Sequence, residues 1–328
     1  MDVQTPAVGD RLALTRLISE VENDANTNLK IIDECYRRSG RAHLIGVTGA
    51  PGTGKSSLVN RITQLIRSES QKTVAIVAVD PSSPFSGGAI LGDRVRMRDL
   101  AGDEGVFIRS MASRGELGGL ARATAAVVRV LDAAGFDLIL IETVGAGQSE
   151  IEIARLAHTT IVVECPGMGD DIQAVKAGIL EIADILAVNK ADLPGAETTE
   201  RILRANLELG YPQAVSAKAG HGGFQEADAQ SSIEGWCPPV IKTVATEGTG
   251  VPEVIKAISQ HRDYLKKTGL FQKRDGERLQ VEFEQILSRA IMENWRNQFS
   301  KEKVDGALME VLSHQRSPAS AVKELLKS

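Results

Sequence analysis

The stretch GAPGTGKS at residues 49–56 constrains the fold of this chain more than any other part of its sequence. It lies between a short apolar run at 44–48 and an amphipathic run at 58–66. The first run is typical of a buried strand, and the second of a helix face, because its apolar residues recur every three or four positions. Together they match the phosphate-loop pattern G-x-x-x-x-G-K-[ST] in the strand–loop–helix context that the pattern requires.

Each residue type in this loop suits the binding of a nucleoside triphosphate. Glycines allow successive backbone N–H groups to point into one concavity, where phosphate oxygens also meet the positive end of the following helix. Lys55 is expected to bridge the β and γ phosphates, and the Ser56 hydroxyl to bind Mg²⁺. The alternative is a purely structural Gly-rich turn with an exposed lysine. The predicted nucleotide contacts are Gly49, Ala50, Pro51, Gly52, Thr53, Gly54, Lys55, Ser56 and Ser57.

Short apolar runs alternate with helical patterns from residue 41 onward, which indicates a parallel sheet with helices on its faces. The runs are nearly continuous in apolar residues, as strands buried on both faces require. We therefore expect an α/β fold of the P-loop NTPase type, with a mostly parallel sheet, helices on both faces and helical extensions at both ends. The predicted strands are 44–48, 74–79, 106–108, 138–141, 160–163, 185–188 and 240–244.

Composition argues against several classes of protein. The chain of 328 residues has a net charge of −5 and no basic cluster, which argues against binding to nucleic acid or to an anionic membrane. Its three cysteines, Cys35, Cys165 and Cys237, are far apart, so disulfides and a structural zinc are not expected. The sequence shows neither a signal peptide nor an apolar run of the ~20 residues that a spanning helix needs. These features predict a soluble protein of the cytoplasm.

A second motif, Asn189-Lys190-Ala191-Asp192, follows the apolar run 185–188 and bears on the choice of base. The carboxyl end of a strand is where α/β proteins bind ligands. There, the Asp192 carboxylate can accept from both N1–H and the exocyclic amine of guanine, and Lys190 can lay its stem along the base. Adenine lacks this pair of donors and would leave the carboxylate desolvated and unpaired. The motif therefore favours GTP over ATP, with Asn189, Lys190 and Asp192 as predicted contacts.

Two loops compete to donate a backbone N–H to the guanine O6. Residues 216–218 read Ser-Ala-Lys, as in small GTPases, but they follow no convincing strand. Residues 244–247 follow the better strand pattern, PPVIKTVA. We favour the second loop, in which Val244, Ala245 and Thr246 are the predicted contacts.

Acidic residues after two of the predicted strands suit a magnesium site. Asp80 and Glu142 each end an apolar run, and Asp93 lies in the Gly-rich segment that follows Asp80. Carboxylates at the ends of strands beside a phosphate loop can hold Mg²⁺ directly or through water. These three residues and Ser56 are the predicted metal ligands. A helix cap or a solvated turn is the structural alternative for each carboxylate.

The segment ETVG at residues 142–145 corresponds in position to the D-x-x-G of small GTPases. The Gly145 N–H would then sense the γ-phosphate. Small GTPases follow this glycine with a glutamine that orients the attacking water. Here Ala146 follows, and Gln148 comes two positions later. We therefore expect slow intrinsic hydrolysis that a partner accelerates.

The sequence predicts three segments. An N-terminal helical extension covers 1–40, a GTPase (G) domain covers 41–265, and a C-terminal helical segment covers 266–328. The last segment carries an apolar stripe that we expect to bury against a second copy of the chain. Packing of the stripe on its own G domain is the alternative. The stripe consists of Phe283, Ile286, Leu287, Ile291 and Trp295.

The longer motifs together resemble the MeaB/ArgK family of P-loop GTPases over about residues 10–300. They are GAPGTGKSSL, VDPSSPFSGGAILGDRVRM, SRGELGGLA, IETVGAGQSE, GMGDDIQAVKAGILEIADILAVNKAD and WCPPVIKTVATEGTGV. The resemblance implies a GTPase metallochaperone for an adenosylcobalamin-dependent acyl-CoA mutase. Such proteins gate cofactor loading, expel damaged cofactor and protect the mutase. The resemblance also implies a homodimer formed through the C-terminal helices.

The same resemblance implies roles for single residues. The three acidic residues map onto the family's Mg²⁺ and switch residues, and 167–176 maps onto its third switch, which is expected to respond to the mutase. The loops LPGAETTERI and 220–235 depart from the better-known members. The sequence therefore leaves open whether the partner is methylmalonyl-CoA mutase or a related isobutyryl- or hydroxyisobutyryl-CoA mutase. The predicted catalytic residues are Lys55, Asp93, Glu142, Gly145, Gln173 and Lys176.

Two other functions compete with this interpretation. A nickel-insertion GTPase would need a His- or Cys-rich segment, but the five histidines are scattered, as is typical of core or surface residues. A small-molecule kinase would need a second substrate pocket and no guanine-selective N-K-x-D motif. Titration with GTP against ATP separates these functions. The histidines are His43, His158, His221, His261 and His314.

Overall fold

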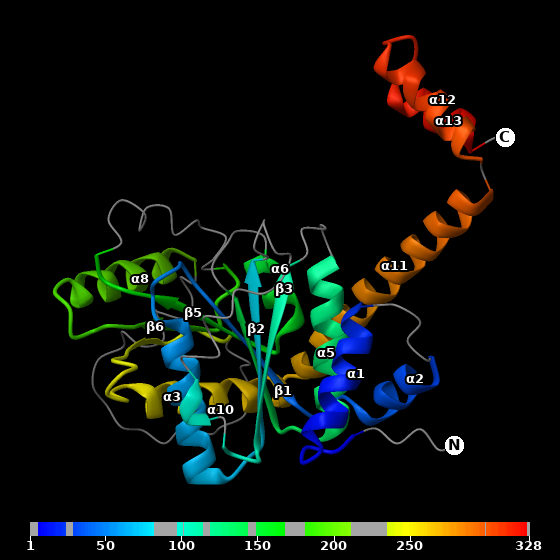
Figure 1. Cartoon of the computed structure of the whole chain (residues 1–328). Coiled ribbons are helices and arrows are strands. Elements are labelled where there is room, and N and C mark those ends of the chain that lie inside the picture. Colours follow the sequence, from blue (N-terminus) through cyan, green and yellow to red (C-terminus); the bar gives the residue numbers. More distant parts are fainter. Residues whose placement is uncertain are drawn as a thin grey trace. The chain divides into compact units, whose positions relative to one another are not determined.

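Each predicted apolar run contributes a strand to one parallel, seven-stranded sheet in the computed structural model (Figure 1). The strands lie in the order β3-β2-β4-β1-β5-β6-β7. The predicted α/β fold with a parallel sheet is confirmed. The strands are β1 (His43–Thr48), β2 (Val74–Pro81), β3 (Val106–Ser113), β4 (Leu138–Thr143), β5 (Thr159–Glu164), β6 (Ile185–Val188) and β7 (Val240–Lys242).

The structure describes nine stretches of the chain, which fall into two compact units, Met1–Asp275 and Gly276–Ser328. The domain limits that the sequence suggests, after residues 40 and 265, stay predictions. The described stretches are 6–23, 29–81, 97–100, 102–113, 119–143, 149–167, 181–210, 235–298 and 300–326.

Successive residues of the central strands enter two different cores, which explains why their sequences are apolar without alternation. In β2, Val74 and Ile76 belong to one buried cluster, whereas Ala75 and Val77 belong to the other. Side chains point to opposite faces of a strand in turn, so each cluster lies on its own face of the sheet. Both faces are covered by helices, as a parallel sheet requires.

Helices α3 and α10 supply one core, and α5 and α6 supply the other. The N-terminal helices α1 and α2 pack on α5 and form an outer layer on that face (Figure 1). Helix α8 packs against β6 and β7. The helices of this unit are α1 (Arg11–Asn23), α2 (Leu29–Arg38), α3 (Lys55–Ser70), the 3₁₀ turn η1 (Arg98–Leu100), α5 (Gly119–Ala134), α6 (Ser149–Leu156), α8 (Ala196–Gly210) and α10 (Val251–Lys267).

The second unit is helical. Helix α11 (Leu270–Gln298) begins in the first unit and continues into the second, followed by α12 (Lys301–Leu312) and α13 (Pro318–Leu325). Ser300 and Ser317 cap the last two helices, because their side chains accept from the N–H groups of Lys303 and Ser320. Four apolar residues of the predicted stripe are between 46% and 65% exposed within the single chain: Phe283, Ile286, Leu287 and Ile291.

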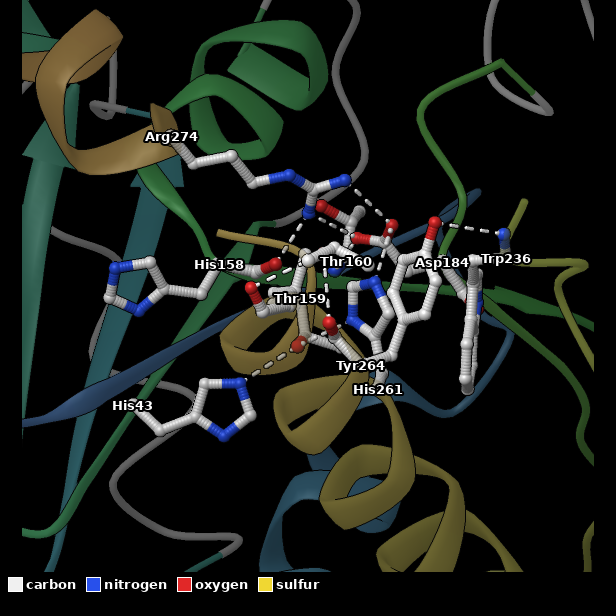
Figure 2. Close-up of polar contacts among 11 residues, drawn as sticks. His43, His158, Thr159, Thr160, Asp184, Trp236, His261, Tyr264 and Arg274 are labelled. Carbon is white, nitrogen blue, oxygen red and sulfur yellow. Dashed lines mark hydrogen bonds and ion pairs between the residues drawn. The ribbon is translucent and has the colours of Figure 1, made fainter. Parts of the chain in front are cut away.

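A polar cluster closes the edge of the sheet at which the strands begin (Figure 2). Asp184, just before β6, accepts from the Thr160 N–H at 2.8 Å and from both terminal nitrogens of Arg274 at 3.0 Å. The same carboxylate lies 3.2 Å from Nε2 of His261 on α10. Asp184 thereby connects the starts of strands β5 and β6 to helices α10 and α11. We call these residues the base cluster, because they lie at the base of the sheet, where the strands begin, and not at the site for the nucleotide base. They are His43, His158, Thr159, Asp184, His261 and Arg274.

The base cluster also binds the first turns of α11. His158 Nε2 lies 2.9 Å from Asp275 Oδ1, and the His158 ring stacks on Phe271 with 4.0 Å between the ring centroids. Arg274 also donates to the His158 carbonyl. These contacts fix the start of α11 on the first unit.

Element boundaries differ from the sequence prediction at six of the seven strands. Strand β3 differs most, because it continues to Ser113, whereas the predicted strand ends at residue 108. Helix α10 spans Val251–Lys267 and so continues past residue 265, where the predicted G domain ends. Strand β7 ends at Lys242, and Val244 instead forms an isolated bridge with Thr249. Within the described stretches, every helix is too short or too polar to cross a membrane.

Candidate functional site

The predicted phosphate loop connects β1 to α3 through three glycines with positive φ. The angle is 138° at Gly49, 82° at Gly52 and 90° at Gly54, a region that residues with side chains rarely adopt. A Cβ at Gly49 would lie 2.1 Å from the Val163 carbonyl oxygen, and one at Gly54 would lie 2.3 Å from Asn189 Nδ2. At Gly49 and Gly54 the loop backbone therefore packs directly on the end of β5 and on Asn189 after β6, with no room for a side chain.

Lys55, the first residue of α3, folds its side chain back over this loop. Its Nζ donates to the carbonyls of Gly49 and Ala50 at 2.8 and 2.9 Å, and the residue is only 5% exposed. Because Gly54 at the N-cap has no side chain, the first N–H groups of α3 face the loop. An ammonium group and a helix N-terminus at one place both favour an anion such as phosphate.

The structure brings two of the predicted metal ligands together. Ser56 Oγ donates to Glu142 Oε1 at 2.5 Å, and Glu142 is buried. Glu142 pairs in register with Ala78 of β2, so Asp80 lies two residues further along at the same edge. Hydroxyl and carboxylate oxygens are the ligands that Mg²⁺ prefers, so the residues at this edge fit the ion. The side chain of Asp80 and all of Asp93 lie outside the described part of the chain.

Asn189 joins the phosphate loop to the loop that follows β7. Its Nδ2 donates to the Thr53 carbonyl at 2.8 Å, and its Oδ1 accepts from the Thr243 hydroxyl and the Ala245 N–H, both at 3.1 Å. The residue is 2% exposed, so its amide serves to position the two loops. Sequence alone predicts Asn189 as a nucleotide contact but does not show which segments it connects.

After Asn189, the N-K-x-D motif forms a turn that exposes Asp192 to solvent. Lys190 has a φ of 56°, and its carbonyl accepts from the Leu193 N–H at 3.0 Å, which closes a tight turn. Asp192 lies at the tip of that turn and is exposed. An exposed carboxylate next to the phosphate loop is available to a ligand.

Several predicted site residues lie outside the described part of the chain. They include the proposed γ-phosphate sensor, both third-switch residues and the competing loop for guanine O6. The residues and ranges are Asp93, Gly145, Gln173, Lys176 and 216–218, together with 220–234 of the loop that departs from the family.

Glu164, the last residue of β5, is a feature of this edge to which sequence reasoning assigns no role. It is 6% exposed, and its backbone carbonyl accepts from the Asn189 N–H at 2.7 Å. Burial and the nearby Glu150 raise the pKa of Glu164 to about 7, while Lys55 opposes the shift. A charged residue at the end of a strongly apolar strand is the only signal in the sequence that could have identified it.

Known proteins match both the sequence and the fold of this chain. Residues 13–300 match the family described as methylmalonyl Co-A mutase-associated GTPase MeaB. A protein of Pyrococcus abyssi that is named as a GTPase is 41% identical, over 97% of this chain and 93% of its own length. The GTPase ArgK of Escherichia coli is 32% identical, over 97% of this chain and 92% of its own length.

One solved structure agrees along most of both chains. It is the crystal structure of an LAO/AO transport system kinase, with 25% identity and a TM-score of 0.67, and the alignment covers 97% of this chain and 93% of that one. The likeness supports the same arrangement of sheet and flanking helices. The family match and the relatives agree with one another, and this chain belongs to the MeaB family of P-loop GTPases.

Proposed function

We propose that this chain hydrolyses GTP at the edge of the sheet that carries the phosphate loop, and serves an adenosylcobalamin-dependent acyl-CoA mutase as its metallochaperone. The observation that carries the nucleotide site is Asn189, whose amide joins the phosphate loop to residues 244–246. The contact brings a phosphate-binding and a base-binding segment within reach of one nucleotide. The family description, which names methylmalonyl-CoA mutase, supports that enzyme or a related isobutyryl- or hydroxyisobutyryl-CoA mutase as the partner.

Base recognition in this proposal uses two segments. Asp192 accepts from N1–H and the exocyclic amine of guanine. In the loop after β7, the Val244 N–H is used within the turn, and the Ala245 N–H donates to Asn189. We therefore assign the Thr246 N–H to guanine O6.

Phosphate binding uses the start of α3. Lys55 exchanges its two carbonyl partners for oxygens of the β and γ phosphates, which gives charge-assisted hydrogen bonds in place of neutral acceptors. Ser56, Glu142 and Asp80 would hold Mg²⁺, with Asp93 added by the family resemblance. When bound, the ion neutralises charge that develops on the phosphate oxygens.

Hydrolysis is proposed to need the partner. Ala146 stands directly after Gly145, in the place of a water-orienting glutamine, so the chain alone should turn over slowly. We assign Gln173 or Lys176 to the stabilisation of the transferred phosphoryl group when the mutase docks. The test is single-turnover hydrolysis with and without the cognate mutase, for the parent and Lys176→Ala. Equal acceleration of both proteins would remove Lys176 from the mechanism.

The mutase itself is tested by capture from the native cell. Tagged full-length chain loaded with a non-hydrolysable GTP analogue should retain an adenosylcobalamin-dependent acyl-CoA mutase, identified by mass spectrometry. The matched bait is the Lys55→Ala chain, which should retain much less because it binds the nucleotide poorly. Recovery of no such mutase by either bait would contradict the proposed partner.

A homodimer through the C-terminal helices is the second proposed interaction. Phe283 and Ile291 on α11 are 65% and 58% exposed in the single chain, which is costly for large apolar side chains unless a partner covers them. We expect the parent to sediment as a dimer and the Phe283→Glu, Ile291→Glu double variant to sediment as a monomer that still binds GTP. A monomeric parent would contradict this proposal.

A further inference from the structure

Glu164 is fixed in place by both halves of the nucleotide site. Strands β1 and β5 pair with Thr48 opposite Val162, so Glu164 lies level with the phosphate loop. Gly49 packs on the carbonyl of Val163, and the Asn189 N–H donates to the carbonyl of Glu164 itself. The residue therefore sits where the phosphate loop meets the N-K-x-D turn.

The side chain of Glu164 lies on the α6 face of the sheet. Ile161 and Val163 belong to the core on the α3 side, so the alternating residues Val162 and Glu164 lie on the opposite face. On that face, a Cβ at Gly46 of β1 would lie 3.0 Å from Ile153 of α6. Helix α6 therefore packs directly on β1.

Glu150 occupies the first turn of α6, one turn before Ile153 and on the same side of the helix. This position places it at the phosphate-loop end of the sheet, because α6 runs back toward the start of β5. Three ionisable residues are thus buried together: Lys55, Glu150 and Glu164 are 5%, 7% and 6% exposed. Glu150 and Lys55 both influence the ionisation of Glu164, in opposite directions.

Nucleotide binding changes the charge balance of this group. A triphosphate brings several negative charges to the loop, and it engages the ammonium of Lys55 that otherwise favours ionised carboxylates nearby. In a buried, low-dielectric place, an ionised carboxylate close to bound phosphate is unfavourable. Neutralising one carboxyl group with a proton from solvent removes this repulsion.

We propose that Glu164 is a positioning residue for GTP binding that takes up a proton from solvent when the nucleotide binds, an inference that rests on the proposed phosphate site. The backbone carbonyl of Glu164 holds Asn189, and the neutral side chain does not repel the phosphates. The groups that face it are Glu150 on α6 and Lys55 on α3, with Cys165 next in the chain and Lys190 beyond β6 close to that thiol.

The direction of the pH effect follows from the free chain. Burial and Glu150 raise the pKa of Glu164 to about 7, so the carboxyl group is mostly ionised at pH 8. Bound phosphate raises this pKa further. GTP affinity should therefore fall as pH rises above 7, by at most about tenfold per pH unit for one linked proton.

The experiment is calorimetric titration of the full-length chain with a non-hydrolysable GTP analogue and Mg²⁺ over a series of pH values that includes 7, 8 and 9, with proton uptake compared at pH 8. Two buffers with different enthalpies of ionisation give the protons taken up per nucleotide. The parent is compared with Glu164→Gln, Glu150→Gln and the control Glu208→Gln, which changes an exposed residue of α8. Titration of the nucleotide itself is common to all four proteins and cancels in the differences.

The parent and the control should take up at least about half a proton more than Glu164→Gln, whose affinity should also fall less between pH 7 and 9. Glu150→Gln should move the maximum of proton uptake to lower pH, because it removes a repelling charge. Tight binding with equal proton uptake in the parent and Glu164→Gln would overturn the inference alone. A parent that does not bind the analogue would overturn the proposed function as well.

Discussion

The two edges of the sheet bury polar groups in opposite ways. At the edge where the strands end, glycine backbone, the first N–H groups of α3 and the ammonium of Lys55 converge on one loop. At the edge where the strands begin, the side chains of the base cluster form hydrogen bonds with one another and with backbone groups (Figure 2). The first edge is arranged to exchange its contacts for a ligand, whereas the second holds strands and helices together.

Hydrogen-bond directions in the base cluster are fixed by their neighbours. The Leu44 N–H donates to His158 Nδ1 at 3.0 Å, so the proton of that neutral ring sits on Nε2 and points to Asp275. Thr159 Oγ1 lies 2.8 Å from His43 Nε2 and 2.9 Å from His261 Nδ1. His261 Nε2 lies 3.2 Å from Asp184. A proton on that nitrogen leaves Nδ1 to accept from the Thr159 hydroxyl, which in turn accepts from His43. The two contacts in which a ring nitrogen accepts, at His158 Nδ1 and His261 Nδ1, require a neutral imidazole.

The comparison predicts that variants at the edge where the strands begin lower stability, whereas variants at the opposite edge lower GTP affinity. Asp184→Ala should have the largest effect on stability. The substitution leaves the Thr160 N–H without its acceptor and removes two hydrogen bonds from Arg274. We expect a loss of about 3–4 kcal/mol in the free energy of unfolding by urea. GTP affinity of the folded protein should change little. Glu181→Ala, at an exposed position nearby, is the control.

Lys55→Ala should show the reverse pattern. It removes charge-assisted contacts to the β and γ phosphates, which we expect to weaken GTP binding by about 3 kcal/mol, or more than a hundredfold. The melting temperature should fall less than that of Asp184→Ala, because the two hydrogen bonds that are lost go to loop carbonyls. Calorimetric titration and thermal melting measure the two effects, with Lys72→Ala as an exposed control. Unfolding, or binding equal to the parent, would contradict the assigned role.

Asp192→Asn tests guanine recognition at the same edge of the sheet. An amide can donate to the xanthine O2 that replaces the guanine amine, whereas a carboxylate repels it. We expect GTP affinity to fall by about 2 kcal/mol and XTP affinity to rise. Competition among GTP, XTP and ATP measures the change. If the preference for GTP is retained, base recognition lies elsewhere in the chain.

Acid should lower the free energy of unfolding through the base cluster. For each histidine, the loss per pH unit is smaller than the effects of the three substitutions above. Burial lowers the pKa of His261 to about 4 and that of His43 well below its ordinary value. Between pH 6.5 and 4 the unfolded chain binds more protons than the folded one, so stability is full above 6.5 and is lost as pH falls. We expect about 1.4 kcal/mol per pH unit for each histidine.

Urea unfolding between pH 7.5 and 5 measures this slope. His261→Gln should flatten it, and the exposed His314→Gln should leave it unchanged. An equal slope in the parent and His261→Gln would show that other groups cause the acid sensitivity.

Sequence reasoning works well where a local pattern decides the structure. The runs at 138–141 and 185–188 identify β4 and β6 because strands buried on both faces must be apolar throughout. The observed β4 extends to Thr143 because Glu142 pairs with neighbouring strands on both sides despite its charge. A polar residue at the end of a strand interrupts the apolar run, so a prediction from apolar residues ends the strand too early.

The base cluster could not be predicted, because its members lie far apart along the chain. His43 begins β1, His158 precedes β5 and His261 lies on α10, and each alone is typical of a core or surface histidine. The same holds for Glu164, whose burial depends on α6 and the phosphate loop together. Only the fold brings such residues into contact.

Hydrogen exchange on the full-length chain, with and without a Mg²⁺-bound GTP analogue, tests the central claim most directly. The nucleotide should slow exchange of backbone amides at 49–56 and at Thr246, where N–H groups are proposed to bind phosphate and guanine. Exchange at 158–160 and at Asp184 should stay unchanged, because those amides belong to the base cluster. Unchanged exchange in the phosphate loop, or protection confined to the base cluster, would contradict the division of the sheet into a binding edge and a structural edge.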